Sequence, residues 1–219
     1  MLRSQSKTHT RRLPSNYRSA IVPKPLPLPR GSSDYKTDWL LESPRLASIA
    51  KVKSLDVPDI HHIRAAQGWL ELGNHLEANA ELENIAPEFR AHPDVLDLRW
   101  HIYAKDAKWD ACGEIAAALL KLAPDCHSGW LHLAYSARRA TGGGLQTAYD
   151  VLRPAAAKFP HVPTIPYNLA CYTCQLGRLK EAWDWLEKAF DISPNPAPLK
   201  TMALDDPDLE PLWLDIAEI

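Results

Sequence analysis

The feature that most constrains this chain is a recurrence of matching residues every 34 to 36 positions. One series has small residues at three of its four positions: Ala66, Trp100, Ala134 and Ala170. A second series has small residues at every position: Ala78, Cys112, Ala148 and Ala182. Prolines recur at a similar spacing of 31 to 36: Pro93, Pro124, Pro160 and Pro194. Because three series agree on one period, the chain is predicted to contain an internal repeat, and each unit of such a repeat is one supersecondary structure.

Each repeat unit has the pattern of two helices joined by a turn. In the fourth unit, apolar residues recur at helical spacing over 167–176, before Gly177, and again over 179–192, before Pro194. The predicted helices of the other three units cover 63–72 and 77–85, 98–107 and 110–124, and 130–140 and 147–160. A single helix pair cannot bury its apolar face alone, so neighbouring pairs must stack. The sequence therefore predicts an all-α chain whose small residues lie where helices cross.

The fourth unit, YNLACYTCQLGRLKEAWDWLEKAFDISP at 167–194, resembles the tetratricopeptide repeat family. That family has an alanine and an aromatic residue on the first helix, a glycine turn, spaced alanines on the second helix, and then a proline. Elsewhere Trp100 stands where a small residue is usual, and Ala107 where glycine is usual. The resemblance covers about residues 59–194 and implies a right-handed α-solenoid of about four such helix pairs. Capping helices are expected on both sides, over 43–58 and 195–219.

The N-terminal segment differs in composition from the rest of the chain. Its first 33 residues hold seven basic residues, five prolines and no acidic residue. Prolines alternating with other residues favour polyproline II, and the low apolar content predicts a disordered tail over 1–42. Three interpretations stay open: a solvated tail, an organelle transit peptide, or a basic arm that associates with nucleic acid through residues 1–40.

The pair Cys171 and Cys174 forms a C-x-x-C motif, which can hold a metal or a redox centre. Both cysteines lie well inside a predicted helix, where the dipole effect that lowers a thiol pKa has faded. No second C-x-x-C or C-x-H pair is present to complete a zinc site. We therefore predict reduced packing cysteines in a cytoplasmic protein, with a thiol or redox protein as the alternative.

No sequence motif indicates catalysis. The chain lacks a P-loop, a G-x-S-x-G and an H-E-x-x-H motif, so we predict a non-enzyme with no cofactor and no metal. It also lacks an apolar run of the roughly 18 residues that a membrane helix needs. Three acidic residues near the C-terminus, Asp205, Asp206 and Asp208, are predicted to cap a helix at a proline turn rather than to bind a cation.

One face of the first helix of each unit is the predicted binding surface, because residues at i, i+3 and i+7 lie on one side of a helix. The resemblance implies that these helices line the concave side of the stack. The predicted groove residues are mostly polar: Arg64, Gln67, His101, Lys105, His132, Tyr135, Arg138, Arg139, Asn168, Cys171 and Gln175. Several are basic, although residues 54–219 hold only 14 Lys and Arg against 24 Asp and Glu. Guanidinium and amide groups bind carboxylates and extended backbone.

The predicted function is that of a non-catalytic scaffold or co-chaperone-like adaptor. Its ligand is expected to be an extended segment of another protein that carries acidic residues or a free C-terminus. Only Asn168 and Arg64 match the family's two-carboxylate clamp for chaperone tails. Pairing of two copies through exposed aromatic side chains such as Trp109 or Trp185 also stays open.

Overall fold

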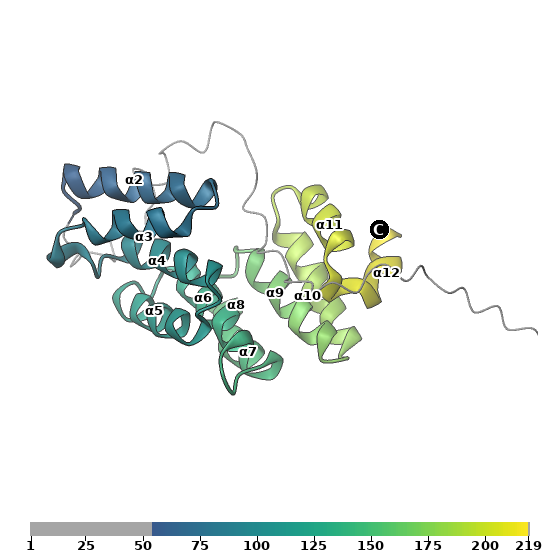
Figure 1. Ribbon diagram of the computed structural model, residues 1–219. Helices are drawn as coiled ribbons and strands as arrows, with labels where there is room; N and C mark the ends of the chain where they lie inside the picture. Colours follow the sequence, from purple (N-terminus) through teal and green to yellow (C-terminus); the bar gives the residue numbers. More distant parts are fainter. Residues whose placement is uncertain (1–53, 219) are drawn as a thin grey trace, which may run out of the picture. The chain divides into compact units, whose positions relative to one another are not determined.

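The structure is a computed structural model, and it describes residues 54–218. The predicted tail (1–42) and its nucleic-acid interpretation lie outside these residues, as does most of the predicted capping helix 43–58. Within 54–218 every regular element is helical, which confirms the predicted all-α class (Figure 1). In chain order the elements are α2 (Val57–Glu71), α3 (His75–Glu83), the 3-10 turn η2 (Pro87–Phe89), α4 (Pro93–Lys105), α5 (Trp109–Leu122), α6 (His127–Arg139), α7 (Leu145–Leu152), α8 (Ala155–Lys158), α9 (Thr164–Gln175), α10 (Leu179–Ile192), α11 (Pro196–Asp205), the 3-10 helix η3 (Pro207–Leu212) and α12 (Trp213–Ala217).

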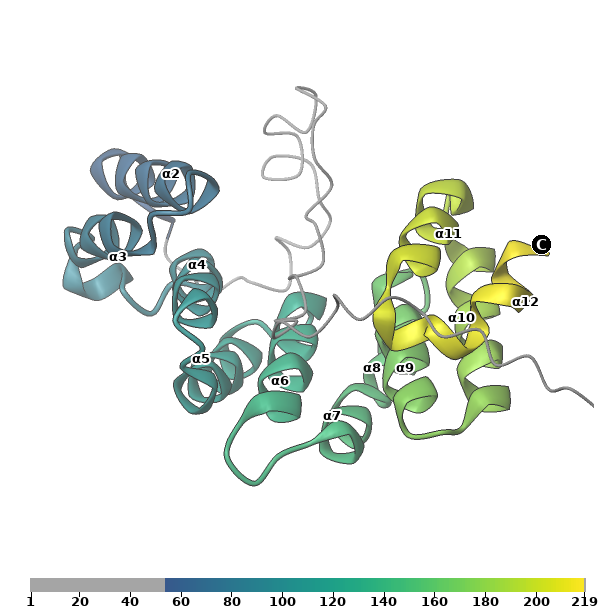
Figure 2. The same ribbon diagram turned by 45° about the vertical axis from the view of Figure 1, so that its right-hand side comes forward.

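The helices pack in the pairs that the repeat predicts. Helix α2 packs on α3, α4 on α5, α6 on α7, and α9 on α10. Each pair also contacts the next one, through α3 and α4, α5 and α6, and α7 and α9. Figures 1 and 2 show the members of the first and last pairs side by side. No helix in the described residues is both long enough and apolar enough to cross a membrane.

The small residues of both series lie at helix contacts, as predicted. Their members Ala66, Ala78, Cys112, Ala134, Ala148, Ala170 and Ala182 are all fully buried. Trp100, the one large residue in the series, is also buried. A side chain that is a methyl group or little more lets two helix backbones approach closely, so these positions tolerate no larger residue without a shift of the pair.

Two predicted elements differ in the structure. The helix expected over 147–160 is divided into α7 and α8, with Arg153 and Pro154 in a turn between them. Proline has no backbone N–H to continue the ladder of hydrogen bonds, and its ring clashes with the preceding turn of a helix. In the predicted capping segment, residues 54–56 are not helical, and Val57 and Pro58 already belong to α2.

The turns between paired helices require a positive φ angle. Gly73 and Gly177 end α2 and α9 with φ angles of 82° and 76°. Ala107 takes the same place after α4, with φ at 53°. An L-residue with a Cβ is disfavoured in this left-handed region, so the second turn is strained relative to the other two.

The C-terminal elements pack on the last helix pair. Leu209, Leu212 and Ile216 are buried, and Trp213 donates a hydrogen bond from Nε1 to the carbonyl oxygen of Ala203 at 3.0 Å. Helix η3 packs mainly against α9, while α11 packs against α10. The polar residues at the start of η3 therefore meet one face of α9.

Candidate functional site

The predicted groove residues lie on the first helix of each pair, as expected. Arg64 and Gln67 are on α2, His101 and Lys105 are on α4, and the other seven are on α6 or α9. Their surroundings nevertheless divide them into three groups: residues bound by the chain's own C-terminal segment, residues buried between helices, and residues open to solvent.

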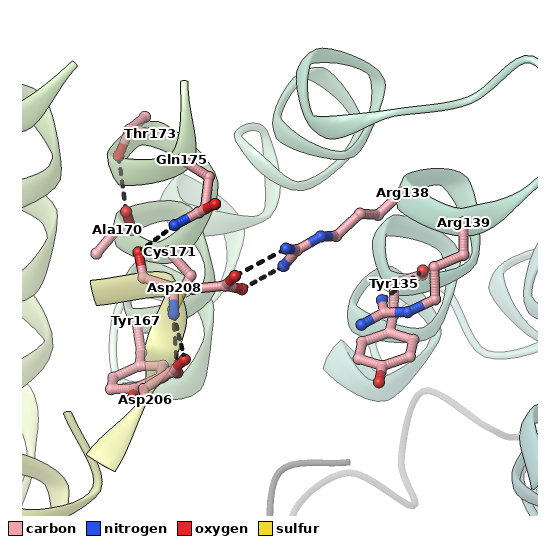
Figure 3. A network of polar contacts seen from close by, with 10 residues as sticks. All are labelled: Tyr135, Arg138, Arg139, Tyr167, Ala170, Cys171, Thr173, Gln175, Asp206 and Asp208. Carbon is pink, nitrogen blue, oxygen red and sulfur yellow. Dashed lines mark hydrogen bonds and ion pairs between the residues drawn. The ribbon is translucent and has the colours of Figure 1, made fainter. Parts of the chain in front are cut away.

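Arg138 on α6 is bound by the C-terminal segment (Figure 3). Its guanidinium group makes a two-point contact with the carboxylate of Asp208, in which Nη2 lies 2.8 Å from Oδ1 and Nη1 contacts Oδ2. This hydrogen-bonded carboxylate raises the pKa of Arg138 further above its already high value. Gln175 on α9 donates a hydrogen bond from Nε2 to the backbone carbonyl oxygen of Asp208 at 3.0 Å.

The carboxylate of Asp206 is held by α9. The hydroxyl group of Tyr167 donates to Asp206 Oδ2 at 3.0 Å, and the thiol of Cys171 donates to the same oxygen at 3.5 Å (Figure 3). The other oxygen accepts from the backbone N–H of Asp208 at 3.0 Å, which makes Asp206 the cap of η3, as predicted for this acidic cluster. Burial, followed by the negative charge of Asp206, raises the pKa of Cys171 well above its usual value. Asp206 and Asp208 thus place acidic groups and backbone on three predicted groove residues: Arg138, Cys171 and Gln175.

The four cysteines are all free, and Cys112, Cys171 and Cys174 are buried. Burial raises the pKa of Cys112 and of Cys174 to about 11. These thiols stay protonated near neutral pH, where only a thiolate is an effective nucleophile or metal ligand. The environment of the C-x-x-C motif is therefore that of packing residues.

Two predicted groove residues are buried instead of facing solvent. Asn168 donates a hydrogen bond from Nδ2 to the carbonyl oxygen of Thr164 at 2.7 Å, so its amide is used within α9. His132 stacks on Trp100, with ring centroids 3.9 Å apart and an angle of 10° between the ring planes. A small residue in place of Trp100 would leave that face of His132 uncovered. The departure from the repeat pattern at Trp100 thus explains why helical spacing alone misplaced His132.

His132 also contacts polar groups on α4. Its Nε2 lies 2.9 Å from Oδ1 of Asp97, and Nε2 of His101 lies 3.8 Å from Oδ2 of the same carboxylate. Burial and then the neighbouring His132 lower the pKa of His101 to about 4. Burial is the largest influence on Asp97 and opposes its ionisation. The hydrogen bond from His132 and the charges of His132 and His101 together outweigh burial, so the pKa of that carboxyl is lowered. Asp97 and His132 come from different repeat units, so helical spacing alone does not predict that these groups lie within hydrogen-bond distance.

Arg139 lies on aromatic rings. Its guanidinium carbon is 3.5 Å from the centroid of the Tyr135 ring and 5.4 Å from that of Trp109. Figure 3 shows Arg139 folded over Tyr135, whereas Arg138 extends away toward Asp208. Nη1 of Arg139 also donates a hydrogen bond to the carbonyl oxygen of Tyr135 at 3.2 Å. These contacts fix the guanidinium group and leave its other N–H groups to bind an anion.

The solvent-accessible remainder of the predicted groove residues forms what we call the open strip. Its members are Arg64, Gln67, His101, Lys105, Tyr135 and Arg139, of which Arg64, Gln67 and Lys105 are exposed and the other three are half-buried. Four of the six are basic or titratable nitrogen groups on α2, α4 and α6. The arrangement offers hydrogen-bond donors and an aromatic ring but no activated nucleophile.

The sequence matches no model of a known protein family, and no curated protein matches it.

Proposed function

We propose that this chain is a non-catalytic interaction scaffold of the tetratricopeptide type, in which about four helix pairs form a right-handed α-solenoid. The period of 34 to 36 residues supports this assignment. It is supported further by the packing of each helix on its neighbours in the chain and by the positive φ angles of Gly73 and Gly177. In this proposal the ligand is an extended, acidic segment of another protein, and it binds along the open strip.

The contacts made by the chain's own C-terminal segment support the proposed chemistry of the ligand. The segment from Asp206 to Asp208 is a short acidic stretch of backbone, and the predicted groove residues bind both its carboxylates and one of its carbonyl oxygens. A partner segment with alternating acidic side chains presents the same groups. The open strip offers it Lys105, Arg64 and Arg139 in place of Arg138. Amide and guanidinium donors of this kind bind backbone carbonyl and carboxylate oxygens together.

Binding of labelled peptides to the full chain tests the proposal. The probe is an Asp- and Glu-rich peptide, measured by fluorescence anisotropy beside its Asn and Gln counterpart. The double variant Arg64→Glu with Lys105→Glu reverses two exposed charges of the open strip. The matched control, Arg153→Glu with Lys180→Glu, reverses two exposed charges outside it. Far-UV circular dichroism verifies that both variants keep the helical signal of the wild type.

We expect the acidic peptide to bind the wild type and the control variant, and its affinity for the open-strip variant to fall about tenfold or more. That loss corresponds to about 1.4 kcal/mol, as expected for two charge-assisted contacts at an exposed surface. Equal weakening by both variants would mean that net charge alone attracts the peptide. Equal binding of the acidic and amide peptides would contradict the proposal that the ligand is an acidic segment.

A further inference from the structure

A cluster of metal-ligand groups lies between α4 and α6. Asp97 and His101 are one turn apart on α4, and His132 projects from α6. One oxygen or nitrogen atom from each of these residues lies within 4.8 Å of the other two. Two imidazoles and one carboxylate form a ligand set that zinc sites with an open fourth position use.

The separations are close to those of a metal site. Nε2 of His132 and Oδ1 of Asp97 are 2.9 Å apart, and Nε2 of His101 and Oδ2 of Asp97 are 3.8 Å apart. Bonds of about 2.0–2.1 Å in a tetrahedral site place ligand atoms about 3.3 Å from one another. The three ligand atoms lie within 4.8 Å of one another, and the side chains of His101 and Asp97 are 36% and 38% exposed, which leaves them room to adjust.

The surroundings of the cluster hold His132 in place. Trp100 stacks on the ring of His132, and the indole N–H of Trp100 donates to Oγ of Ser136 at 2.9 Å. The hydroxyl group of Ser136 in turn donates to the carbonyl oxygen of His132 at 2.7 Å. Outer contacts of this kind orient ligands and strengthen metal sites.

We propose that Asp97, His101 and His132 bind one divalent transition-metal ion, with Zn²⁺ as the best-fitting ion and a fourth coordination position open to solvent. An ion bound to Nε2 of His132 takes the place of the hydrogen bond between that atom and Asp97, and the neutral ring then carries its single proton on Nδ1. The half-exposed side chains of His101 and Asp97 leave a path by which the ion enters.

A second cluster, Cys171 with Asp206 and Asp208, has the same number of ligand atoms but suits a cation poorly. The carboxylate of Asp208 already pairs with the guanidinium group of Arg138, and Asp206 accepts from Tyr167. A metal ion there must displace a positive charge and a thiol proton of raised pKa. This cluster therefore provides a control.

Zinc binding to the full chain, stripped of metal with EDTA and then freed of the chelator, tests the proposal. A chromophoric chelator competes for Zn²⁺ and reports affinity and stoichiometry. Co²⁺ serves as a second probe, because its visible absorption distinguishes tetrahedral from octahedral coordination. The ligand variants are His101→Gln and Asp97→Asn, which alter half-exposed side chains and so spare the core. The controls are Cys171→Ser and His75→Gln, since His75 lies on α3 and pairs with Asp106 rather than with the cluster.

We expect one Zn²⁺ per chain, with affinity reduced at least tenfold in each ligand variant and unchanged in both controls. Loss of an outer contact alone lowers metal affinity about 10–100-fold. Loss of a direct ligand should lower the affinity at least as much. The melting temperature of the wild type should rise with Zn²⁺, and that of His101→Gln should not. Absence of wild-type binding overturns the proposal, as does equal affinity of the wild type and both ligand variants. Loss of binding in Cys171→Ser assigns the ion to the other cluster and also overturns it.

Discussion

The ion pair between Arg138 and Asp208 gives the most quantitative prediction, because it joins residues 70 positions apart in the chain. The two side chains are 19% and 21% exposed, so water screens the pair only in part. Exposed ion pairs contribute about 0.2–1 kcal/mol, and hydrogen bonds to charged groups about 1.5–3 kcal/mol. For a two-point contact at intermediate exposure, we expect a coupling free energy of about 1–2 kcal/mol.

A double-mutant cycle with Arg138→Met and Asp208→Asn measures this coupling. Methionine keeps an apolar stem, and asparagine keeps the shape of the aspartate. Each single variant leaves a half-buried partner unpaired and should lower the free energy of unfolding by about 1.5–3 kcal/mol, as read from urea denaturation. The double variant should lose less than the sum of the two by the coupling energy. Amide hydrogen exchange across 206–212 should become faster in each variant, because η3 then separates from α9 more often.

The exposed pair Lys158 and Asp125, 3.2 Å apart, is the matched control. The cycle with Lys158→Met and Asp125→Asn should give a coupling below about 0.5 kcal/mol. If the Arg138 cycle gives a coupling as small as that of the control, the assignment of a strong pair is wrong. Unchanged exchange across 206–212 would show that the pair does not hold the C-terminal segment.

Three further changes have predictable outcomes. Ala107→Gly removes a Cβ from a residue with a positive φ angle and should raise the free energy of unfolding by about 0.5–1 kcal/mol in urea denaturation. Gly143→Ala places a Cβ 1.9 Å from the carbonyl oxygen of Ala137, so it should lower the melting temperature. Burial, and then His132, lower the pKa of His101 to about 4 in the folded chain. As the pH falls, this histidine is therefore protonated in the unfolded chain before it is protonated in the folded chain. With EDTA present, the free energy of unfolding should decrease from about pH 6.5 to pH 4, and His101→Gln should flatten that decrease.

Much of the fold could be predicted from the sequence because the same packing problem recurs in each unit. Each helix crossing needs a buried small residue, so small residues recur at a fixed spacing in the sequence, as at Ala66 and Ala134. The glycine at the end of a first helix marks a backbone angle that other residues adopt reluctantly, as at Gly73. The break between α7 and α8 was missed because the apolar pattern continues through Pro154 even though the hydrogen-bond ladder does not.

The candidate site could be predicted only in part. Helical spacing placed every predicted groove residue on the intended helix, but it carries no information on what covers that face. The segment that binds Arg138 and Gln175 is not part of the repeat, so no periodic signal connects Asp208 to either of them. His132 is buried because Trp100 is larger than the residue the repeat predicts there, and such a local exception acts only through three-dimensional packing.

The central proposal is that the predicted groove residues bind an acidic, extended segment of another protein. The chain's own Asp208 already contacts two of these residues, Arg138 and Gln175. The most direct test compares the affinity of the acidic peptide for the wild type, for Asp208→Asn, and for Asp205→Asn, an exposed neighbour with the same change of charge. The account predicts that Asp208→Asn frees Arg138 and binds the peptide several-fold more tightly than Asp205→Asn does. Equal affinity of these two variants, or weaker binding by Asp208→Asn, would contradict it.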